Sequence, residues 1–322
     1  MISFSDIREA ADRINPYIVK TPLVRLANLD PFLDCQVYGK LENLQVTGAF
    51  KLRGAVNKIL SLPKEQLEKG VVCASSGNHG KAVAYSAKRL GIPATVVIPL
   101  TAPAIKVEAI RALGADVVQC EVSERFRVAA EIRDQKGAAL IPPYDDELIM
   151  AGQGTAGLEI AEQQPDLDAV IVPVSGGGLI GGVSTAIKAA APDMKVWGAE
   201  PAVLPRYTES LKKGERVQVP ATKTIADALV SNMPGERCFP VVQKNVDQVF
   251  DIPEDAVLKG MKLLLTEGKI LAEPSSCIGI AGVLTGIIPV TPEQKICFLI
   301  SGGSVGLSQI AQLENVELPK LS

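Results

Sequence analysis

The sequence predicts an α/β protein made of two open, twisted domains with a ligand cleft between them. Short runs of β-branched residues alternate with helix-length segments, a pattern typical of parallel sheets with helical crossovers on both faces. The chain of 322 residues is long enough for two such domains. Glycine-rich loops follow two of the predicted strands, and ligands of open α/β sheets bind at the carboxyl ends of strands.

Seven runs are predicted to be strands: 70–75, 94–98, 115–120, 169–174, 195–199, 248–252 and 295–300. Helices are expected between them, for example over 79–90 and 104–113. Each of these two is followed by a glycine, Gly91 or Gly114, as is common at a helix C-terminus. A second strand–helix series begins after Asp145, so the chain divides into two blocks without a long linker.

The charge balance argues against a nucleic-acid partner. The chain has 33 basic and 36 acidic residues and a formal net charge of -3, with no basic block or aromatic-interleaved basic stripe. Six cysteines are scattered without a C-x-x-C pair, which indicates free thiols in a reducing compartment. Charged residues in segment 1–9 do not suit a signal peptide, so we expect no export and a cytoplasmic location.

Two uncharged stretches, 169–187 and 274–292, approach the length of a membrane span. Both contain several glycines and at least one proline, which suits strand–loop and loop–helix units in a buried core. We therefore expect no membrane association.

The glycine-rich segment 175–182 lies between the predicted strand 169–174 and a helix-compatible stretch, 179–191. Glycine permits positive φ and close backbone approach, and the free N–H groups of a helix start favour a phosphate. The segment lacks both the Lys-Ser/Thr ending of a P-loop and the G-x-G-x-x-G dinucleotide spacing. It predicts an anion cradle, and a plain tight turn is the alternative.

Lys51 lies in a Thr-Gly-Ala-Phe-Lys-Leu-Arg-Gly-Ala segment, 47–55, upstream of both glycine-rich loops, 75–80 and 175–182. A lysine amine is normally protonated, with a pKa of about 10.4. Desolvation or a nearby cation, such as Arg53, lowers that pKa and makes carbonyl capture possible. A lysine on the surface is the alternative. Together these motifs suggest a lysine held against a phosphate-bearing cofactor.

Segment 42–55, Glu-Asn-Leu-Gln-Val-Thr-Gly-Ala-Phe-Lys-Leu-Arg-Gly-Ala, resembles the cofactor-lysine motif of fold-type II pyridoxal-phosphate enzymes, specifically the threonine/serine dehydratase and serine racemase family. The likeness covers nearly the whole chain, because further motifs follow in the family's order at 75–80, 151–155, 175–182, 224–227, 273–274 and 301–303. It implies a tryptophan synthase β-subunit-like fold. The large cofactor-binding domain would comprise 1–50 and 146–322, and 51–145 would form a small mobile domain.

The resemblance assigns a role to individual positions. Lys51 would bond to pyridoxal 5'-phosphate, and the backbone of Ser175, Gly176, Gly177, Gly178 and Leu179 would hold the phosphate. Further cofactor contacts are implied for Phe50, Asn78 (the ring hydroxyl), Glu273 and Ser301 (the pyridine nitrogen). Substrate contacts are implied for Ser75, Ser76, Gly77, Asn78, His79 and Arg127. A neutral hydroxyl at Ser301 cannot keep the ring nitrogen charged, which favours elimination.

The implied activity is the dehydration and deamination of L-serine or L-threonine to a 2-oxo acid and ammonia by a cytoplasmic homodimer, with Lys51 as general base. Ser76 occupies the position where racemase-capable relatives carry an opposite-face acid, so an amino-acid racemase acting on serine or aspartate is the main alternative. Ser76 could instead only hydrogen-bond the substrate. A dehydratase of another β-hydroxy amino acid, as in hydroxyectoine breakdown, a β-replacement synthase and a sensor without turnover also stay open.

His79 is the only histidine, and its place beside the carboxylate loop favours positioning over proton transfer. Arg127 faces the cleft in the racemase branch, although a solvated helix charge is the alternative. Racemase-like relatives hold a divalent cation with a glutamate, a carbonyl four residues on and an acid six residues on. Glu200 and Leu204 fit this pattern, but Arg206 replaces the acid. We predict that Arg206 pairs with Glu200 and that no metal binds there.

Overall fold

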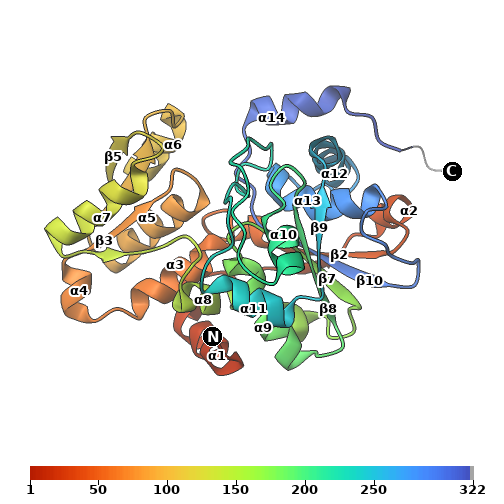
Figure 1. Cartoon of the computed structure of the whole chain (residues 1–322), viewed down its shortest axis with the longest axis horizontal. Helices are drawn as coiled ribbons and strands as arrows, with labels where there is room; N and C mark the ends of the chain where they lie inside the picture. Colours follow the sequence, from red (N-terminus) through yellow and green to blue (C-terminus); the bar gives the residue numbers. More distant parts are fainter. Residues whose placement is uncertain (320–322) are drawn as a thin grey trace.

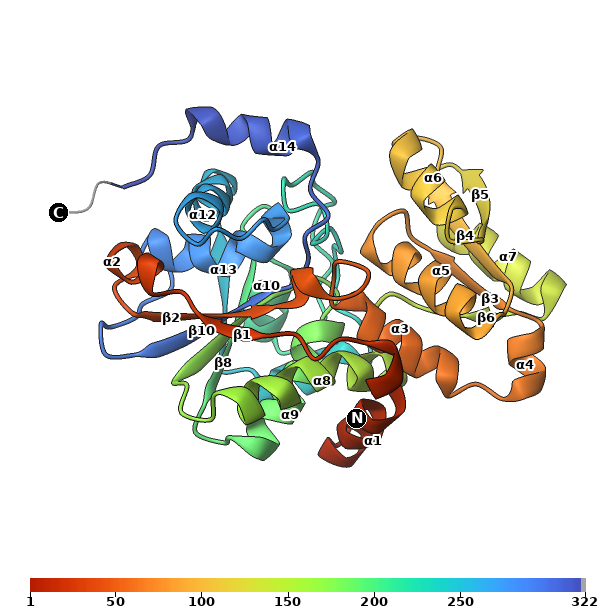
Figure 2. The same ribbon diagram turned by 180° about the vertical axis from the view of Figure 1, so that it is seen from behind.

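The computed structural model describes residues 1–319 and contains two separate β-sheets (Figures 1 and 2). The larger has the order β1-β2-β10-β7-β8-β9 and the smaller β5-β4-β3-β6. The larger sheet consists of β1 (Leu23–Arg25), β2 (Gln36–Leu41), β7 (Ala169–Pro173), β8 (Lys195–Pro201), β9 (Gln248–Ile252) and β10 (Lys295–Ile300). The smaller consists of β3 (Val71–Ala74), β4 (Ala94–Pro99), β5 (Asp116–Cys120) and β6 (Ala139–Leu140). Every strand pair is parallel except β1–β2, which confirms the predicted α/β class.

Helices cover both faces of the larger sheet, because alternate strand residues point to opposite sides. Val170 and Val172 of β7 pack with α8 and α9, whereas Ile171 packs with α12 and α13. The helices outside the smaller unit are α1 (Phe4–Ile14), α2 (Asp30–Leu33), α8 (Glu147–Gln163), α9 (Gly178–Ala190), α10 (Arg206–Lys213), α11 (Cys238–Asn245), α12 (Glu254–Thr266), α13 (Pro274–Leu284) and α14 (Leu307–Ala311). Short 3-10 helices are η1 (Asn15–Tyr17), η2 (Ala27–Leu29), η3 (Glu42–Leu44) and η4 (Gln312–Asn315).

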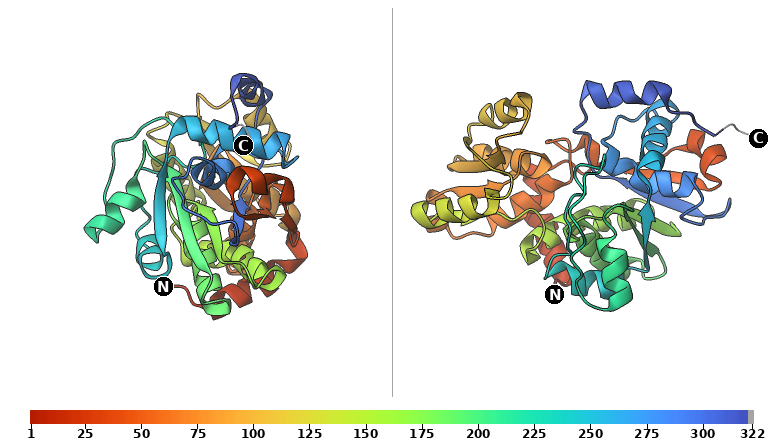
Figure 3. Two further views of the ribbon diagram at one scale, coloured as in Figure 1. Left: turned by 90° about the vertical axis from the view of Figure 1, so that its right-hand side faces the viewer. Right: turned by 45° about the horizontal axis from the view of Figure 1, so that its top comes forward.

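The smaller sheet also has helices on both faces. Val71 and Cys73 of β3 pack toward the α5 side, and Val72 packs toward α7. The helices of this unit are α3 (Lys51–Leu60), α4 (Lys64–Glu68), α5 (Asn78–Leu90), α6 (Ala104–Arg111) and α7 (Arg125–Lys136). Helix α3 lies where the two units meet and contacts both α5 and α8 (Figures 1 and 2). The right-hand view of Figure 3 shows the two units side by side. Its first residue is Lys51, so the predicted lysine sits at the junction.

The predicted element boundaries agree closely with the structure where glycine or a capping residue sets them. Gly91, with a left-handed φ of 67°, directly follows α5 as predicted. Helix α6 ends earlier than predicted, at Arg111, and Gly114, with a φ of 83°, lies three residues beyond it. Asp146 caps α8, because its side chain accepts hydrogen bonds from the N–H groups of Leu148 and Ile149. The described residues include no helix with the length and hydrophobicity needed to cross a bilayer.

Strands β1, β2 and β6 were not predicted, although β2 lies inside the larger sheet. Gln36–Leu41 carries Gly39 and Lys40, which break the apolar pattern of a central strand. Lys40 is nevertheless fully buried, because its ammonium group bonds to Glu159 of α8. A charge that is paired in three dimensions is invisible to a pattern read along one segment.

Candidate active site

A cavity of about 410 Å³ lies between the two units and gathers almost all the predicted site residues. Its lining includes Phe50, Lys51, Ser75, Ser76, Gly77, Asn78, His79, Ser175, Gly176, Gly177, Gly178, Leu179, Glu273 and Ser301. These residues come from separate parts of the sequence and meet because β3, β7 and β10 all direct their carboxyl ends toward the cavity. A wider surface groove of about 640 Å³ beside β5 contains none of them.

Lys51 is held at the cavity by the two residues that follow β10, Ser301 and Gly302. Ala49 forms a β-bridge with Gly302, and the Phe50 N–H donates to the Ser301 carbonyl at 3.0 Å. The Lys51 ammonium donates to the Pro143 carbonyl at 2.6 Å and lies 5.1 Å from the centroid of the Phe50 ring. Burial lowers the pKa of Lys51 to about 8. Much more of this amine is therefore neutral and nucleophilic near pH 7 than in a lysine with the ordinary pKa.

The turn from β7 to α9 forms a cradle of free backbone N–H groups. Gly177 has a φ of 101°, and a Cβ atom there would lie 1.8 Å from the Tyr207 hydroxyl oxygen. A Cβ atom on Gly176 would lie 2.4 Å from the Tyr144 ring, so neither position accepts a side chain. Within residues 1–319, no N–H group from Ser175 to Ile180 has an acceptor. These free N–H groups belong to the turn and to the first residues of α9, and free donors at the start of a helix favour a bound anion.

A second set of free N–H groups lies at the start of α5. The N–H groups of Ser76, Asn78 and His79 find no acceptor in the described part of the chain. Gly80 allows the loop to fold tightly, since a Cβ atom there would lie 2.0 Å from the Ser75 carbonyl oxygen. The loop can therefore hold a second anionic group, such as a carboxylate, in the same cavity.

His79 is buried behind this loop, and its Nε2 lies 2.9 Å from the Ile141 carbonyl, to which it must donate. Burial, reinforced by the charge of Lys51, lowers the pKa of His79 to about 3. The ring is therefore neutral near pH 7 and cannot act as a cationic acid. This favours the positioning role expected from the sequence.

Asn78 joins the two walls of the cavity. Its amide nitrogen lies 3.0 Å from both carboxylate oxygens of Glu273, and its amide oxygen accepts from the Ser304 hydroxyl at 2.6 Å. Burial raises the pKa of Glu273 to about 7. Ser301 lies deeper, with its hydroxyl 3.0 Å from that of Ser276. In this structure the Asn78 amide is thus turned toward Glu273 and Ser304.

The structure does not place Arg127 in the cavity. Its guanidinium group is largely exposed and is paired with Glu124 and Glu131 on the outside of α7. Arg125 lines the cavity instead, and its buried Nε has no partner within residues 1–319. Side chains two residues apart on a helix are rotated by about 200° about its axis, so only one of Arg125 and Arg127 can face the cavity.

Arg206 pairs with Glu200, as the sequence predicts. The two groups are fully buried, and Arg206 Nε lies 3.5 Å from Glu200 Oε2. The Leu204 carbonyl accepts from Arg206 Nη1 at 2.8 Å. The guanidinium group thus occupies the oxygen atoms that the resemblance would assign to a cation. No group of three or more His, Cys, Asp or Glu side chains in residues 1–319 is arranged to hold a metal ion.

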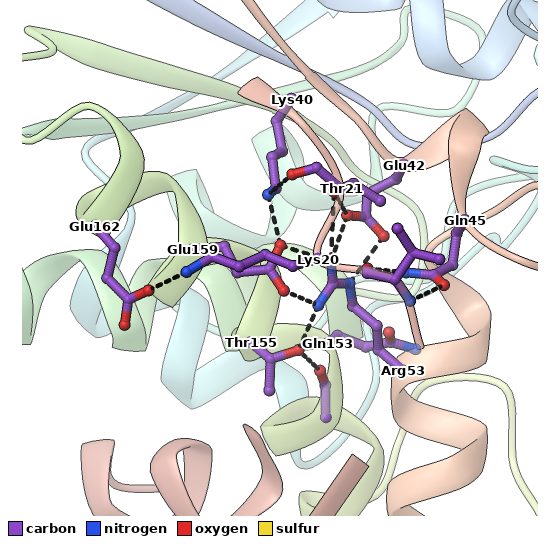
Figure 4. Close-up of polar contacts among 12 residues, drawn as sticks. Lys20, Thr21, Lys40, Glu42, Gln45, Arg53, Gln153, Thr155, Glu159 and Glu162 are labelled. Atoms are coloured by element: carbon purple, nitrogen blue, oxygen red, sulfur yellow. Dashed lines mark hydrogen bonds and ion pairs between the residues drawn. The ribbon is translucent and has the colours of Figure 1, made fainter. Parts of the chain in front are cut away.

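A buried ionic cluster beside the cavity was not predicted (Figure 4). Arg53 donates to both carboxylate oxygens of Glu42, at 2.7 and 2.8 Å, and to both of Glu159, at 2.7 and 2.9 Å. Lys40 adds a second cation, at 2.5 Å from Glu159. The expectation that Arg53 lowers the pKa of Lys51 is wrong, because its charge is neutralised by these carboxylates and burial is the dominant cause.

The sequence pattern of the family described as "Pyridoxal-phosphate dependent enzyme" matches residues 14–302. The chain is 39% identical over 313 residues to an L-threonine ammonia-lyase of Geobacter sulfurreducens, covering 97% of this chain and 78% of that protein. It is 37% identical over 313 residues to an L-threo-3-hydroxyaspartate ammonia-lyase of Saccharomyces cerevisiae, covering 97% and 96%. The solved structure of maize serine racemase superimposes with a TM-score of 0.92 at 39% identity, covering 96% of each chain.

Proposed function

The chain belongs to the pyridoxal-phosphate dependent enzymes, and from that membership we propose that it is an ammonia-lyase converting L-serine or L-threonine to a 2-oxo acid and ammonia. The observation that carries the proposal is the meeting of the desolvated Lys51 amine and two separate anion cradles in one cavity. An aldehyde, a phosphate and a substrate carboxylate each then have a complementary group.

The residues present fit pyridoxal phosphate. Lys51 would hold its aldehyde carbon, and the free N–H groups of 175–179 would hold its phosphate. Phe50, Asn78, Glu273 and Ser301 line the same cavity and would surround the ring. When bound, the cofactor supplies an electron-withdrawing ring that stabilises negative charge at the substrate's α-carbon.

The protein's own groups then bind the substrate and move its protons. The free N–H groups of the loop 75–79 would bind the substrate carboxylate and so fix the direction of the α-proton. Lys51 Nζ, with a pKa of about 8, would accept that proton as general base. The β-hydroxyl would leave as water with a proton returned by the Lys51 ammonium. The released enamine would tautomerise to an imine, which water would hydrolyse to the 2-oxo acid and ammonia.

Assays on a panel of β-hydroxy amino acids test the proposal: serine, threonine and 3-hydroxyaspartate. We expect ammonia and 2-oxo acid in equal amounts from serine or threonine. Bound cofactor without product from any amino acid would contradict a lyase and support a sensor. Formation of a new amino acid from serine and an added thiol, in place of the oxo acid, would indicate a β-replacement synthase.

Ser76 separates the lyase from an amino-acid racemase. Ser76 lines the cavity on the loop proposed to bind the carboxylate, and the family resemblance would make its hydroxyl the acid that protonates the α-carbon from the face opposite Lys51. If it does, Ser76→Ala should lower D-amino acid formation by roughly 10²-fold or more, the size expected for loss of a general acid, while oxo-acid release continues. Chiral chromatography and an oxo-acid assay measure the two rates.

Ser86→Ala is the matched control, because Ser86 lies on α5, the helix that follows the Ser76 loop, and bonds to the Ala82 carbonyl inside that helix. It should leave the ratio of the two rates unchanged. A parallel loss of both activities in Ser76→Ala would mean that Ser76 only binds the carboxylate.

The rate at which the cofactor-free protein captures pyridoxal phosphate should depend on pH. Only the neutral amine attacks an aldehyde, so the rate should rise roughly tenfold per pH unit below the pKa of Lys51 and level off above pH about 8. Stopped-flow absorbance measures the rate, with N-acetyl-lysine methyl ester as a water-exposed comparison whose amine titrates near its ordinary value. A midpoint above pH 10 for the protein would contradict the desolvated lysine.

We further propose that residues 1–50 and 146–322 form the cofactor-binding domain and that 51–145 form a small mobile domain. The division into two sheets supports this, and α3 is the place where a closing movement would be transmitted to Lys51. The six free thiols support a cytoplasmic location. We expect a homodimer, which size-exclusion chromatography with light scattering would test.

A further inference from the structure

We infer that Arg206 and Tyr207 are positioning residues that aim the N–H groups of the β7–α9 turn at the cofactor phosphate, so that a protein cation organises this anion site. The inference rests on the proposed function, and it concerns residues that lie behind the turn and do not line the cavity.

Two neighbouring residues at the start of α10 hold three successive carbonyl groups of the turn. Arg206 Nη2 donates to the Val174 carbonyl, and its Nε donates to the Ser175 carbonyl at 3.3 Å. The Tyr207 hydroxyl donates to the Gly176 carbonyl at 3.1 Å, which also accepts from the Gly235 N–H at 2.9 Å. The back of the turn is therefore fully occupied by donors.

The orientation of these carbonyls determines the orientation of the N–H groups. In a trans peptide unit the C=O bond of one residue and the N–H bond of the next point in opposite directions. The described residues contain no cis peptide bond. With the carbonyls of 174–176 directed toward α10, the N–H groups of 175–177 are directed away from it. These N–H groups have no acceptor in residues 1–319, and their residues line the cavity.

The positioning groups are themselves rigidly held. Glu200 accepts from the N–H groups of Tyr207, at 3.0 Å, and Thr208, at 2.7 Å, and it forms the ion pair with Arg206. Arg206 and Tyr207 are both fully buried. A donor that cannot move costs no reorganisation when an anion binds, which is the condition for a strong preorganised anion site.

Gly177 ties the same pair to the shape of the turn. A Cβ atom on Gly177 would lie only 1.8 Å from the Tyr207 hydroxyl oxygen, so the phenol occupies the space of a side chain there. The turn therefore needs glycine for two reasons, its φ of 101° and the approach of Tyr207. The Tyr207 phenol thus packs against one side of the turn backbone, and the free N–H groups lie on the other side.

Binding of pyridoxal phosphate and of pyridoxal, which lacks the phosphate, to the cofactor-free protein separates positioning from general structural support. Tyr207→Phe removes one hydrogen bond and keeps the ring packing. We expect it to weaken pyridoxal phosphate binding roughly fivefold, as one net hydrogen bond predicts, and to change pyridoxal binding less than about twofold. Arg206→Met should weaken pyridoxal phosphate binding more than Tyr207→Phe does, and Arg206→Lys should restore part of the loss.

Tyr85→Phe is the control, because Tyr85 packs against the smaller sheet far from the turn and has no side-chain hydrogen bond in the described residues. Circular dichroism and thermal unfolding of each cofactor-free variant check the fold. If Arg206→Met does not fold, Tyr207→Phe still decides. Equal weakening of both ligands, or no weakening of either, would overturn the inference. Failure of the wild-type protein to bind pyridoxal phosphate would instead contradict the proposed function.

A chelator gives an independent measurement. Because a guanidinium group already binds the Leu204, Val174 and Ser175 carbonyls, the wild-type affinity for pyridoxal phosphate should be the same in EDTA and in millimolar MgCl₂ or CaCl₂. A loss of tenfold or more in EDTA that Mg²⁺ or Ca²⁺ reverses would show that a metal ion, not Arg206, organises the turn.

Discussion

Lys51→Ala should abolish turnover, with ammonia release from serine or threonine falling by at least roughly 10³-fold, and it should remove the visible absorbance of the bound cofactor. The substitution deletes both the buried amine proposed to hold the aldehyde and the group proposed to take the α-proton. Lys51 is the first residue of α3, so alanine at this position does not interrupt the helix. Circular dichroism should therefore match that of the wild-type protein.

Three measurements check this expectation: the absorbance spectrum after dialysis, the rate of ammonia release, and mass spectrometry after borohydride reduction. Reduction should place the cofactor mass on the wild-type peptide that contains Lys51 and on no other peptide. Lys64→Ala, an exposed lysine on α4, is the matched control and should behave like the wild-type protein. Substantial turnover by Lys51→Ala would refute the proposed chemistry.

Arg53→Met should lower the free energy of unfolding by about 3–5 kcal/mol, the usual cost of leaving buried carboxylates without their cation. Arg53 is fully buried and bonds to both oxygens of Glu42 and of Glu159 (Figure 4). Methionine fills most of the space but provides no donor. Lys40 still bonds to Glu159, so Glu42 is the carboxylate that loses most.

Urea unfolding, followed by tryptophan fluorescence and circular dichroism, measures the loss. Arg133→Met is the control, because Arg133 and Asp134 form an exposed pair on α7 and its removal should leave the urea midpoint unchanged. A second variant, Arg53→Met with Glu42→Gln, removes one charge of each sign and should recover part of the stability. An unchanged midpoint in Arg53→Met would mean that the cluster does not stabilise the fold.

The cluster also bears on catalysis through its position in the chain. Arg53 lies two residues after Lys51 and joins α3 to α8 and to the loop after β2. The opposite side of α3, with Ala55 and Ile59, belongs to the core beneath the smaller sheet. The cluster thus fixes the first turn of α3, and with it Lys51, relative to the larger sheet. The apolar side of α3 packs with the smaller sheet.

Local features explain which site residues could be predicted. The glycines at 176–178 matter for their backbone freedom, and Lys51 matters for its amine. Both properties belong to the residue itself and can be recognised from a short segment of sequence. Arg125 and Arg127 show the limit. The two arginines are only two residues apart, but the rotation of α7 about its axis turns Arg125 toward the cavity and Arg127 toward solvent. That rotation is set by packing against β3 and β4, not by the residues themselves.

The sequence by itself determined the α/β class, most strand positions, the glycine turn after β7 and the lysine that shares its cavity, because each depends on hydrophobic periodicity or on a few neighbouring residues. Only the tertiary structure decided that Lys40 can sit in a buried strand, that Arg53 is neutralised by Glu42 and Glu159, and that Arg206 and Tyr207 lie behind the turn. Buried charges and aimed carbonyls depend on partners far away in the chain, and a partner becomes readable only once the fold has brought it within hydrogen-bond distance.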